Sequence, residues 1–87
     1  DYDSEQTTVK SDKNGNISLY FSVNSYNLFD VRFYDDETGE DVGSYGVFAN
    51  NENAYTFIGF EKEKTYNVEV QSQTKEDWNI DGNYIIY

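Results

Sequence analysis

The 87-residue sequence contains no cysteine, histidine, proline or methionine. Without cysteine and histidine there is no thiol nucleophile, no imidazole base and no zinc site built from those two residue types. The sequence contains six Lys and Arg residues and 17 Asp and Glu residues. The resulting net charge of −11 repels the phosphate backbone of nucleic acids. We therefore expect no enzyme, assign no catalytic residue, and expect no nucleic-acid partner.

Long apolar runs are also missing. No stretch approaches the roughly 20 apolar residues that a membrane helix requires, so we expect no membrane insertion. Aliphatic residues are scarce, but nine Tyr, six Phe and one Trp are present, and each aromatic ring can bury roughly 150–250 Å². The length is that of one small domain, so we expect residues 1–87 to fold as a single unit.

Apolar and polar residues alternate in most of the chain, which is typical of half-buried strands. The clearest case is Ile17, Leu19, Phe21 and Val23, which alternate with polar residues and Tyr20. No window shows helical spacing with caps. We predict an all-β, antiparallel two-sheet sandwich of about seven strands, either immunoglobulin- or fibronectin III-like or jelly-roll-like, with a small barrel as the alternative. The expected strands are 5–11, 16–24, 29–35, 41–49, 54–60, 65–72 and 82–87.

Turn residues punctuate the strands at short spacing. Asn14-Gly15 is typical of a two-residue type I′ turn and predicts a hairpin that joins strand 5–11 to strand 16–24. Residues 1–12 are polar, and they predict an N-terminal strand that is flexible or able to cross to the sheet edge of a neighbouring molecule.

A second hairpin is predicted at Thr38-Gly39, and with a two-residue turn its register places Arg32 opposite Tyr45 on the solvent face. Tyr34 lies two residues further on, and Tyr20 occupies the solvent face of its own strand. We predict Tyr20, Arg32, Tyr34 and Tyr45 as an exposed aromatic face that stacks on sugar rings or packs against another subunit. The alternative is cross-strand pairing with a cation–π contact to Arg32, which only stiffens the sheet. The same register places Glu37 opposite Glu40, a like-charge pair that a bound cation or a looser turn would relieve.

The stretch from Asp77 to Gly82 fits the head of a calcium-binding loop, in which alternate residues supply oxygen ligands and a glycine permits the sharp turn. We predict Asp77, Asn79 and Asp81 as calcium ligands, with Asn83 adding a backbone carbonyl. The alternative is an ordinary polar turn, so the expected cofactor is either calcium or none.

The stretch Gly59–Val70, which contains Thr65-Tyr66-Asn67-Val68, resembles the end of a fibronectin type III-like sandwich. The resemblance implies a tyrosine corner, in which the Tyr66 hydroxyl bonds back to the backbone of the preceding turn.

The wider stretch 17–87 is similar to bacterial pre-peptidase C-terminal domains and collagenase-type binding modules. The resemblance rests on Phe-Asp-Val-Arg-Phe-Tyr-Asp-Asp at 29–36, on Lys-x-Tyr-x-Val-x-Val at 64–70 and on Gly-Asn-Tyr-Ile-Ile at 82–86. It implies an accessory part of a secreted protein, and some such modules bind calcium or insoluble polymers.

These observations predict a non-catalytic extracellular module for surface attachment or ligand binding, with calcium as a stabilising ion if the loop binds it. The cysteine-free, acidic composition favours a secreted bacterial protein at the cell surface, with a protein or polysaccharide partner there, or with self-association. Because the chain opens at Asp1, we expect a removed leader or a larger parent protein. One alternative is a structural subunit of a filament or matrix that assembles by strand exchange, and another is an acidic mimic of DNA that inhibits a nucleic-acid-binding protein.

Overall fold

The computed structural model describes residues 4–23, 26–72 and 84–86 of the chain. No residue in these ranges is helical, so these ranges contain no helix long and apolar enough to cross a membrane. The all-β prediction is confirmed for this part of the chain. Its strands are β1 (Ser4–Lys10), β2 (Ile17–Ser22), β3 (Asn27–Asp35), β4 (Asp41–Ala49), β5 (Glu52–Phe57), β6 (Thr65–Ser72) and β7 (Tyr84–Ile86).

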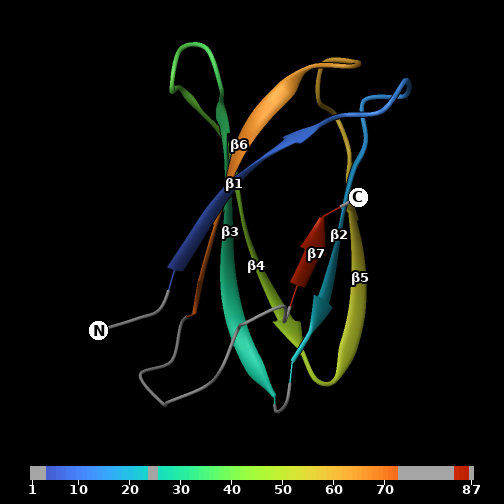
Figure 1. Cartoon of the computed structure of the whole chain (residues 1–87), viewed down its shortest axis with the longest axis vertical. Helices are drawn as coiled ribbons and strands as arrows, with labels where there is room; N and C mark the ends of the chain where they lie inside the picture. The colour runs from blue at the N-terminus through green and yellow to red at the C-terminus, as the bar shows by residue number, and fades with distance from the viewer. Residues whose placement is uncertain (1–3, 24–25, 73–83, 87) are drawn as a thin grey trace.

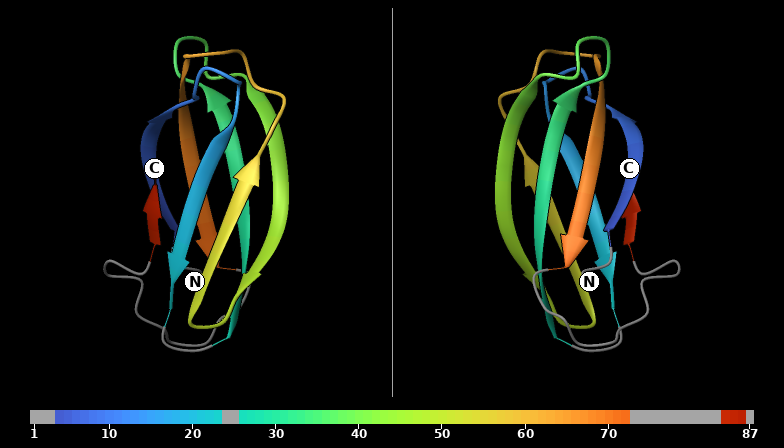
Figure 2. Two further views of the ribbon diagram at one scale, coloured as in Figure 1. Left: turned by 90° about the vertical axis from the view of Figure 1, so that its right-hand side faces the viewer. Right: turned by 90° about the vertical axis from the view of Figure 1, so that its left-hand side faces the viewer.

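The strands form two antiparallel sheets that lie face to face (Figure 1). The four-stranded sheet has the order β1-β6-β3-β4 and the three-stranded sheet has the order β5-β2-β7. Two side views show the layers edge-on, with turns gathered at both ends (Figure 2). The two-sheet sandwich is confirmed, and the barrel alternative is wrong because these strands divide into two separate sheets.

The core lies between the sheets and is made by the alternating residues of β2, β3 and β6. Phe33 is completely buried, and its ring centroid lies 5.1 Å from that of Phe57 and 4.9 Å from that of Phe60. Aromatic side chains therefore fill much of the space that aliphatic residues fill in other small domains. The buried hydrophobic residues are Val9, Ile17, Leu19, Phe21, Val23, Phe29, Val31, Phe33, Ala49, Phe57, Tyr66, Val68 and Val70.

The predicted hairpin at Asn14-Gly15 is wrong, although a tight turn is present. The Asp12 carboxylate accepts hydrogen bonds from the backbone N–H groups of Asn14 and Asn16 at 2.8 and 2.9 Å, and Gly15 has a positive φ of 79°. However, β1 pairs with β6 rather than with β2, so the turn carries the chain from one sheet to the other. Turn chemistry specifies a reversal of the chain but not the sheet that each flanking strand joins.

The hairpin between β3 and β4 is present, but its turn is longer than two residues. The Asp35 N–H donates to the Glu40 carbonyl at 2.8 Å, and the Gly39 N–H donates to the Asp35 carbonyl at 2.8 Å, so the loop is 36–39. A register shift between Phe33 and Tyr34 accompanies it. The Asp35 carboxylate, which accepts from the backbone of the loop, stabilises this wider turn. The Glu37–Glu40 pair of a two-residue turn is therefore absent, and the alternative, a looser turn, is present.

The terminal strands depart from the immunoglobulin plan. In that plan the first strand joins the sheet of the second and fifth strands, whereas here β1 lies beside β6 and β7 lies beside β2. The strand expected at 54–60 is displaced as well. It begins at Glu52 and ends at Phe57, and Gly59, with a φ of 92°, follows in the connection to β6.

The tyrosine corner is confirmed by its hydrogen bond. The Glu61 N–H donates to the hydroxyl oxygen of Tyr66 at 3.0 Å, and Tyr66 is 3% exposed. The same connection is fastened to the first turn, because the Ser11 hydroxyl accepts from the Lys64 N–H at 2.9 Å. Ser11 is one of the few buried polar residues in the described part of the chain.

Candidate functional site

The outer face of the four-stranded sheet carries a row of polar side chains. The register places Gln6 beside Glu69, Glu69 beside Arg32, and Arg32 beside Ser44, so the row crosses all four strands. The Gln6 amide donates to one Glu69 carboxylate oxygen at 3.2 Å, and the Tyr34 hydroxyl lies 3.4 Å from the other oxygen. One carboxylate thus connects side chains from three strands.

An open recess of about 380 Å³ lies where this face meets the turn between β3 and β4. It offers two amides, two carboxylates and one phenol ring, which together supply both donors and acceptors of hydrogen bonds. A ligand with several hydroxyl groups suits such a lining, while an anion would be repelled by the carboxylates. The lining residues are Gln6, Tyr34, Asp35, Asp36, Gly39 and Asn67.

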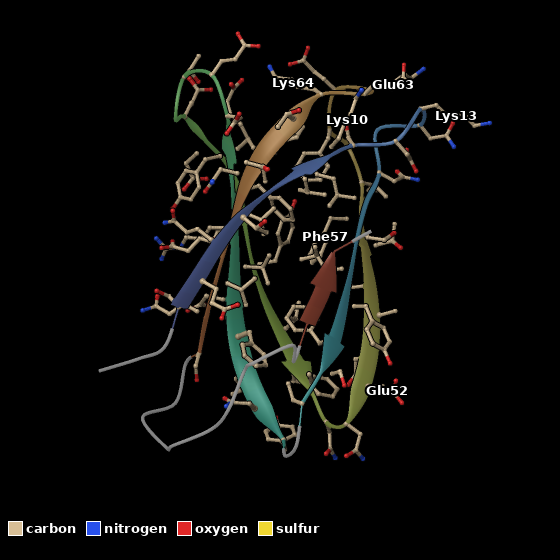
Figure 3. The ribbon with its side chains drawn as sticks, in the orientation of Figure 1. Lys10, Lys13, Glu52, Phe57, Glu63 and Lys64 are labelled. Atoms are coloured by element: carbon tan, nitrogen blue, oxygen red, sulfur yellow. The ribbon has the colours of Figure 1, made fainter. Side chains whose placement is uncertain are left out.

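Asp35 has a structural role at the margin of the recess. Its carboxylate lies 2.7 Å from the Lys64 ammonium, which also lies 3.0 Å from the Glu61 carboxylate. The Lys64 ammonium is the main cause that lowers the pKa of Asp35, followed by the N–H groups of Glu37 and Thr38. The pKa of Lys64 is raised, chiefly by its contact with Asp35 and then by Glu61. Figure 3 shows Lys64 at the end of the molecule that carries the turn.

Arg32 lies exposed next to the recess. Its contact with Tyr34 is the largest cause that raises the pKa of the guanidinium, and the carboxylates of Asp30 and Glu69 contribute further. Arg32 therefore stays positively charged and partly offsets the acidic residues around it. The face as a whole is polar and of mixed charge rather than purely acidic.

Of the four residues predicted as an aromatic face, only Arg32 and Tyr34 come together. Tyr20 lies on the outer face of the other sheet, in the solvent-facing phase of β2. Tyr45 pairs with Val31 rather than with Arg32, and its ring contacts Phe33 and Phe57 at centroid distances of 6.0 and 5.0 Å. Tyr45 is 40% exposed, but it lies on the opposite side of the sheet from Arg32. The four-residue loop alone moves the register by two residues, which keeps the face. The irregularity between Phe33 and Tyr34, whose partners are Gly43 and Asp41, makes the net shift one residue and so reverses the face.

The predicted calcium ligands Asp77, Asn79, Asp81 and Asn83 lie outside the described residues. Within the described part, no group of three or more Asp, Glu, His or Cys side chains is placed to hold a metal ion. The calcium site stays a prediction from the sequence.

Sequence reasoning missed Gln6 and Asn67 as members of the recess. The alternation of Tyr66, Val68 and Val70 does indicate that Asn67 and Glu69 face solvent. The pairing of β1 with β6, which brings Gln6 to Glu69, joins residues 63 positions apart and has no local signal.

Comparison with known proteins adds no relative to this description: no family model matches the chain, and no curated protein or solved structure shows significant similarity to it.

Proposed function

We propose that the chain is a non-catalytic extracellular binding module, similar in its two-sheet layout to pre-peptidase C-terminal and fibronectin type III-like modules, that binds a polysaccharide on the outer face of the four-stranded sheet. The observation that carries the proposal is the recess lined by amide, carboxylate and tyrosine side chains. Amides both donate and accept hydrogen bonds, so pairs of them can match the hydroxyl groups of a sugar ring.

The negative charge of the chain restricts the class of polysaccharide that it can bind. With a net charge of −11 and with Asp35 and Asp36 in the lining, an anionic polymer meets repulsion both at long range and at the site. A neutral saccharide carries no charge and therefore meets neither the long-range repulsion nor the repulsion at the site. The shallow, open shape suits one or two sugar units of a longer polymer rather than an enclosed small molecule.

The test is binding of neutral oligosaccharides by calorimetry or affinity electrophoresis, with an anionic oligogalacturonate for comparison. Tyr34→Ala removes the ring at the recess and Asn67→Asp replaces an amide donor by a charge, and each should weaken binding by about tenfold or more, which corresponds to about 1.4 kcal/mol. Thr56→Ala is the matched control, because Thr56 is exposed on the other sheet. Absence of any neutral ligand, or equal binding by Tyr34→Ala and the unaltered chain, would contradict the proposal.

A specific observation favours a second candidate, assembly by strand exchange. Only Val9 of the seven residues in β1 is buried, so few apolar contacts hold this edge strand against β6. The test uses a chain that starts at residue 13, with a peptide of residues 1–12 supplied separately. Exchange requires the peptide to bind the shortened chain and to restore its thermal stability. A shortened chain that neither binds the peptide nor changes in melting temperature would exclude it.

A further inference from the structure

The free edge of β4 is long and carries no charge along most of its length. β4 is the outermost strand of its sheet and pairs with β3 alone among the described strands. From Val42 to Ala49 it contains no charged residue and no proline. Edge strands are ordinarily protected from pairing with other chains by charges, prolines or bulges, and the register irregularity here lies only at the Asp41 end. Both views of Figure 2 show β4 along one margin of the sandwich.

Exposed apolar side chains gather on the same strand. Of the five large hydrophobic residues that are exposed in the described part, three belong to β4: Val42, Tyr45 and Phe48, with 41%, 40% and 50% of their surface accessible. A fourth, Tyr26, stacks on Phe48 with ring centroids 5.8 Å apart. An unpaired backbone edge and a concentration of exposed apolar side chains therefore coincide, which is typical of an interaction surface.

We propose that this edge pairs with β4 of a second copy of the chain, antiparallel, with Tyr45 on the two-fold axis. In this register Ser44 faces Gly46 of the second copy, and Val42 faces its Phe48. Gly43 faces Val47 of that copy. The sequence of β4 is thus complementary to itself, as a two-fold interface requires.

The antiparallel direction also separates the acidic turns. Residues 36–41 contain four acidic side chains and adjoin one end of β4. Across nine residues of strand, at about 3.4 Å per residue, the two turns lie about 30 Å apart, several times the Debye length of about 8 Å at physiological salt. Parallel pairing would place the turns side by side.

The other described edges suit a second copy less well. β1 carries Glu5 and Lys10 and exposes five of its seven residues, and β5 is six residues long with Glu52 at its start. Glu52 lies at the far end of the sandwich from Lys64 (Figure 3). The Tyr55 hydroxyl donates to the Phe48 carbonyl, which ties β5 to the end of β4 and leaves the stretch 42–47 as the open edge.

The pairing would join the four-stranded sheets of the two copies into one continuous eight-stranded sheet. The outer face of each copy would then point to the same side of this sheet. If the saccharide proposal holds, the dimer presents two recesses to one polymer and gains avidity from the second contact. The dimer itself does not depend on the saccharide proposal. It depends only on the edge of β4.

Sedimentation velocity over a concentration series tests the dimer. Because each copy carries −11 charges, we expect association to strengthen between about 0.05 and about 0.5 M NaCl, as screening increases. Ser44→Glu places two like charges beside the axis and should raise the dissociation constant by about tenfold. The monomer should keep its fold, because Ser44 is exposed and faces Arg32 across the β3–β4 ladder.

Thr8→Glu is the matched control, because it adds the same charge to an exposed position of the opposite edge strand. Loss of the dimer with Ser44→Glu alone supports the proposal. A strict monomer at millimolar concentration overturns it, as does equal loss, or no loss, with both variants. A dimer that is lost only with Thr8→Glu would place the interface at β1 and also overturn it.

A cysteine cross-link tests the register. The chain has no cysteine, and directly opposed residues of antiparallel strands lie within the Cα distance that a disulfide spans. Tyr45→Cys should therefore give a covalent dimer under mild oxidation, while Thr8→Cys should stay monomeric. A dimer that persists in sedimentation but never cross-links through position 45, with the variant shown to be folded by circular dichroism, would overturn the assigned register.

Discussion

Tyr66 and Asp35 show how single side chains hold the ends of the strands in place. Tyr66 is buried and accepts a hydrogen bond from the connection that precedes its own strand. Asp35 accepts from the turn that follows its strand and contacts Lys64 at the start of β6. Both residues thus connect irregular segments to the sheet, and the recess is built on the segment that Asp35 orders.

We expect Tyr66→Phe to lower the free energy of unfolding by about 1 kcal/mol, because the Glu61 N–H loses its acceptor while the ring keeps its packing. Urea denaturation measures the change. Tyr26→Phe is the control, because Tyr26 is 60% exposed, and a change within about 0.5 kcal/mol is expected there. Equal effects of the two substitutions would show that the tyrosine corner adds nothing to stability.

The contact between Asp35 and Lys64 predicts a pH dependence. Because the pKa of Asp35 is lowered in the folded chain, its contribution is complete above the unfolded pKa near 4 and is lost as the pH falls through the folded pKa. Asp35→Asn removes this titration but keeps an acceptor for the turn. In urea denaturation the unaltered chain should be more stable than Asp35→Asn at about pH 7, and the difference should shrink as the pH falls through the lowered pKa of Asp35. A difference that does not change with pH would contradict this origin.

At the scale of elements, the two glycine turns differ in their surroundings. Gly15 and Gly39 both have positive φ, 79° and 76°. A Cβ at Gly15 would lie 2.3 Å from the Phe60 carbonyl oxygen, whereas a Cβ at Gly39 would meet no atom within 4 Å. The turn at Gly15 therefore packs against the connection between β5 and β6, and the turn at Gly39 is open.

We expect Gly39→Ala to cost about 1–2 kcal/mol of unfolding free energy, the cost of a left-handed conformation for a residue with a Cβ. Gly15→Ala should cost about 1–3 kcal/mol more, because the backbone of Phe60 must also move. Thermal or urea unfolding of the two variants side by side gives the comparison. If Gly15→Ala is no worse than Gly39→Ala, the turn does not pack on the Phe60 backbone.

The alternation of residues was sufficient to predict the strands but not their partners. Ile17, Leu19 and Phe21 are each buried as their spacing predicts, because the side-chain period of a strand is a local property. The partner of β1 depends on contacts with β6, far along the chain, and no neighbouring residue encodes it. The predicted register of β3 and β4 was wrong for a local reason. The Asp35 carboxylate stabilises a four-residue loop, and the irregularity between Phe33 and Tyr34 leaves an extra residue on β4. The net shift is one residue, which moves Tyr45 to the other side of the sheet.

The same limit applies to the candidate site. The alternation of residues in β3 correctly placed Arg32 and Tyr34 on the solvent-facing side of the strand. These two of the four residues predicted as an aromatic face lie together. The recess also needs Gln6 and Asn67, which come from two other strands, and only the sheet order brings them together.

At the scale of the whole molecule, the acidic charge and the predicted calcium loop make a joint prediction. Calcium at ten to a hundred times a dissociation constant typical of extracellular modules should stabilise the fold by roughly 1.4–2.7 kcal/mol, and each kcal/mol raises the melting temperature by about 4–8 °C in a chain of this size. Magnesium at the same concentration controls for screening of the −11 charge. Replacement of Asp77 and Asp81 by Asn should abolish the difference between the two ions. Equal melting temperatures in calcium and magnesium would contradict a specific site.

We propose above that the outer face of the four-stranded sheet is the binding surface. The most direct measurement is a titration of the ¹⁵N-labelled chain with neutral oligosaccharides, followed by the amide chemical shifts. We expect the amide shifts of Gln6, Tyr34 and Asn67 to change together. Those of Ser18, Tyr20 and Thr56, on the other sheet, should stay constant. Shifts confined to the three-stranded sheet, or no shifts with any neutral saccharide, would contradict it.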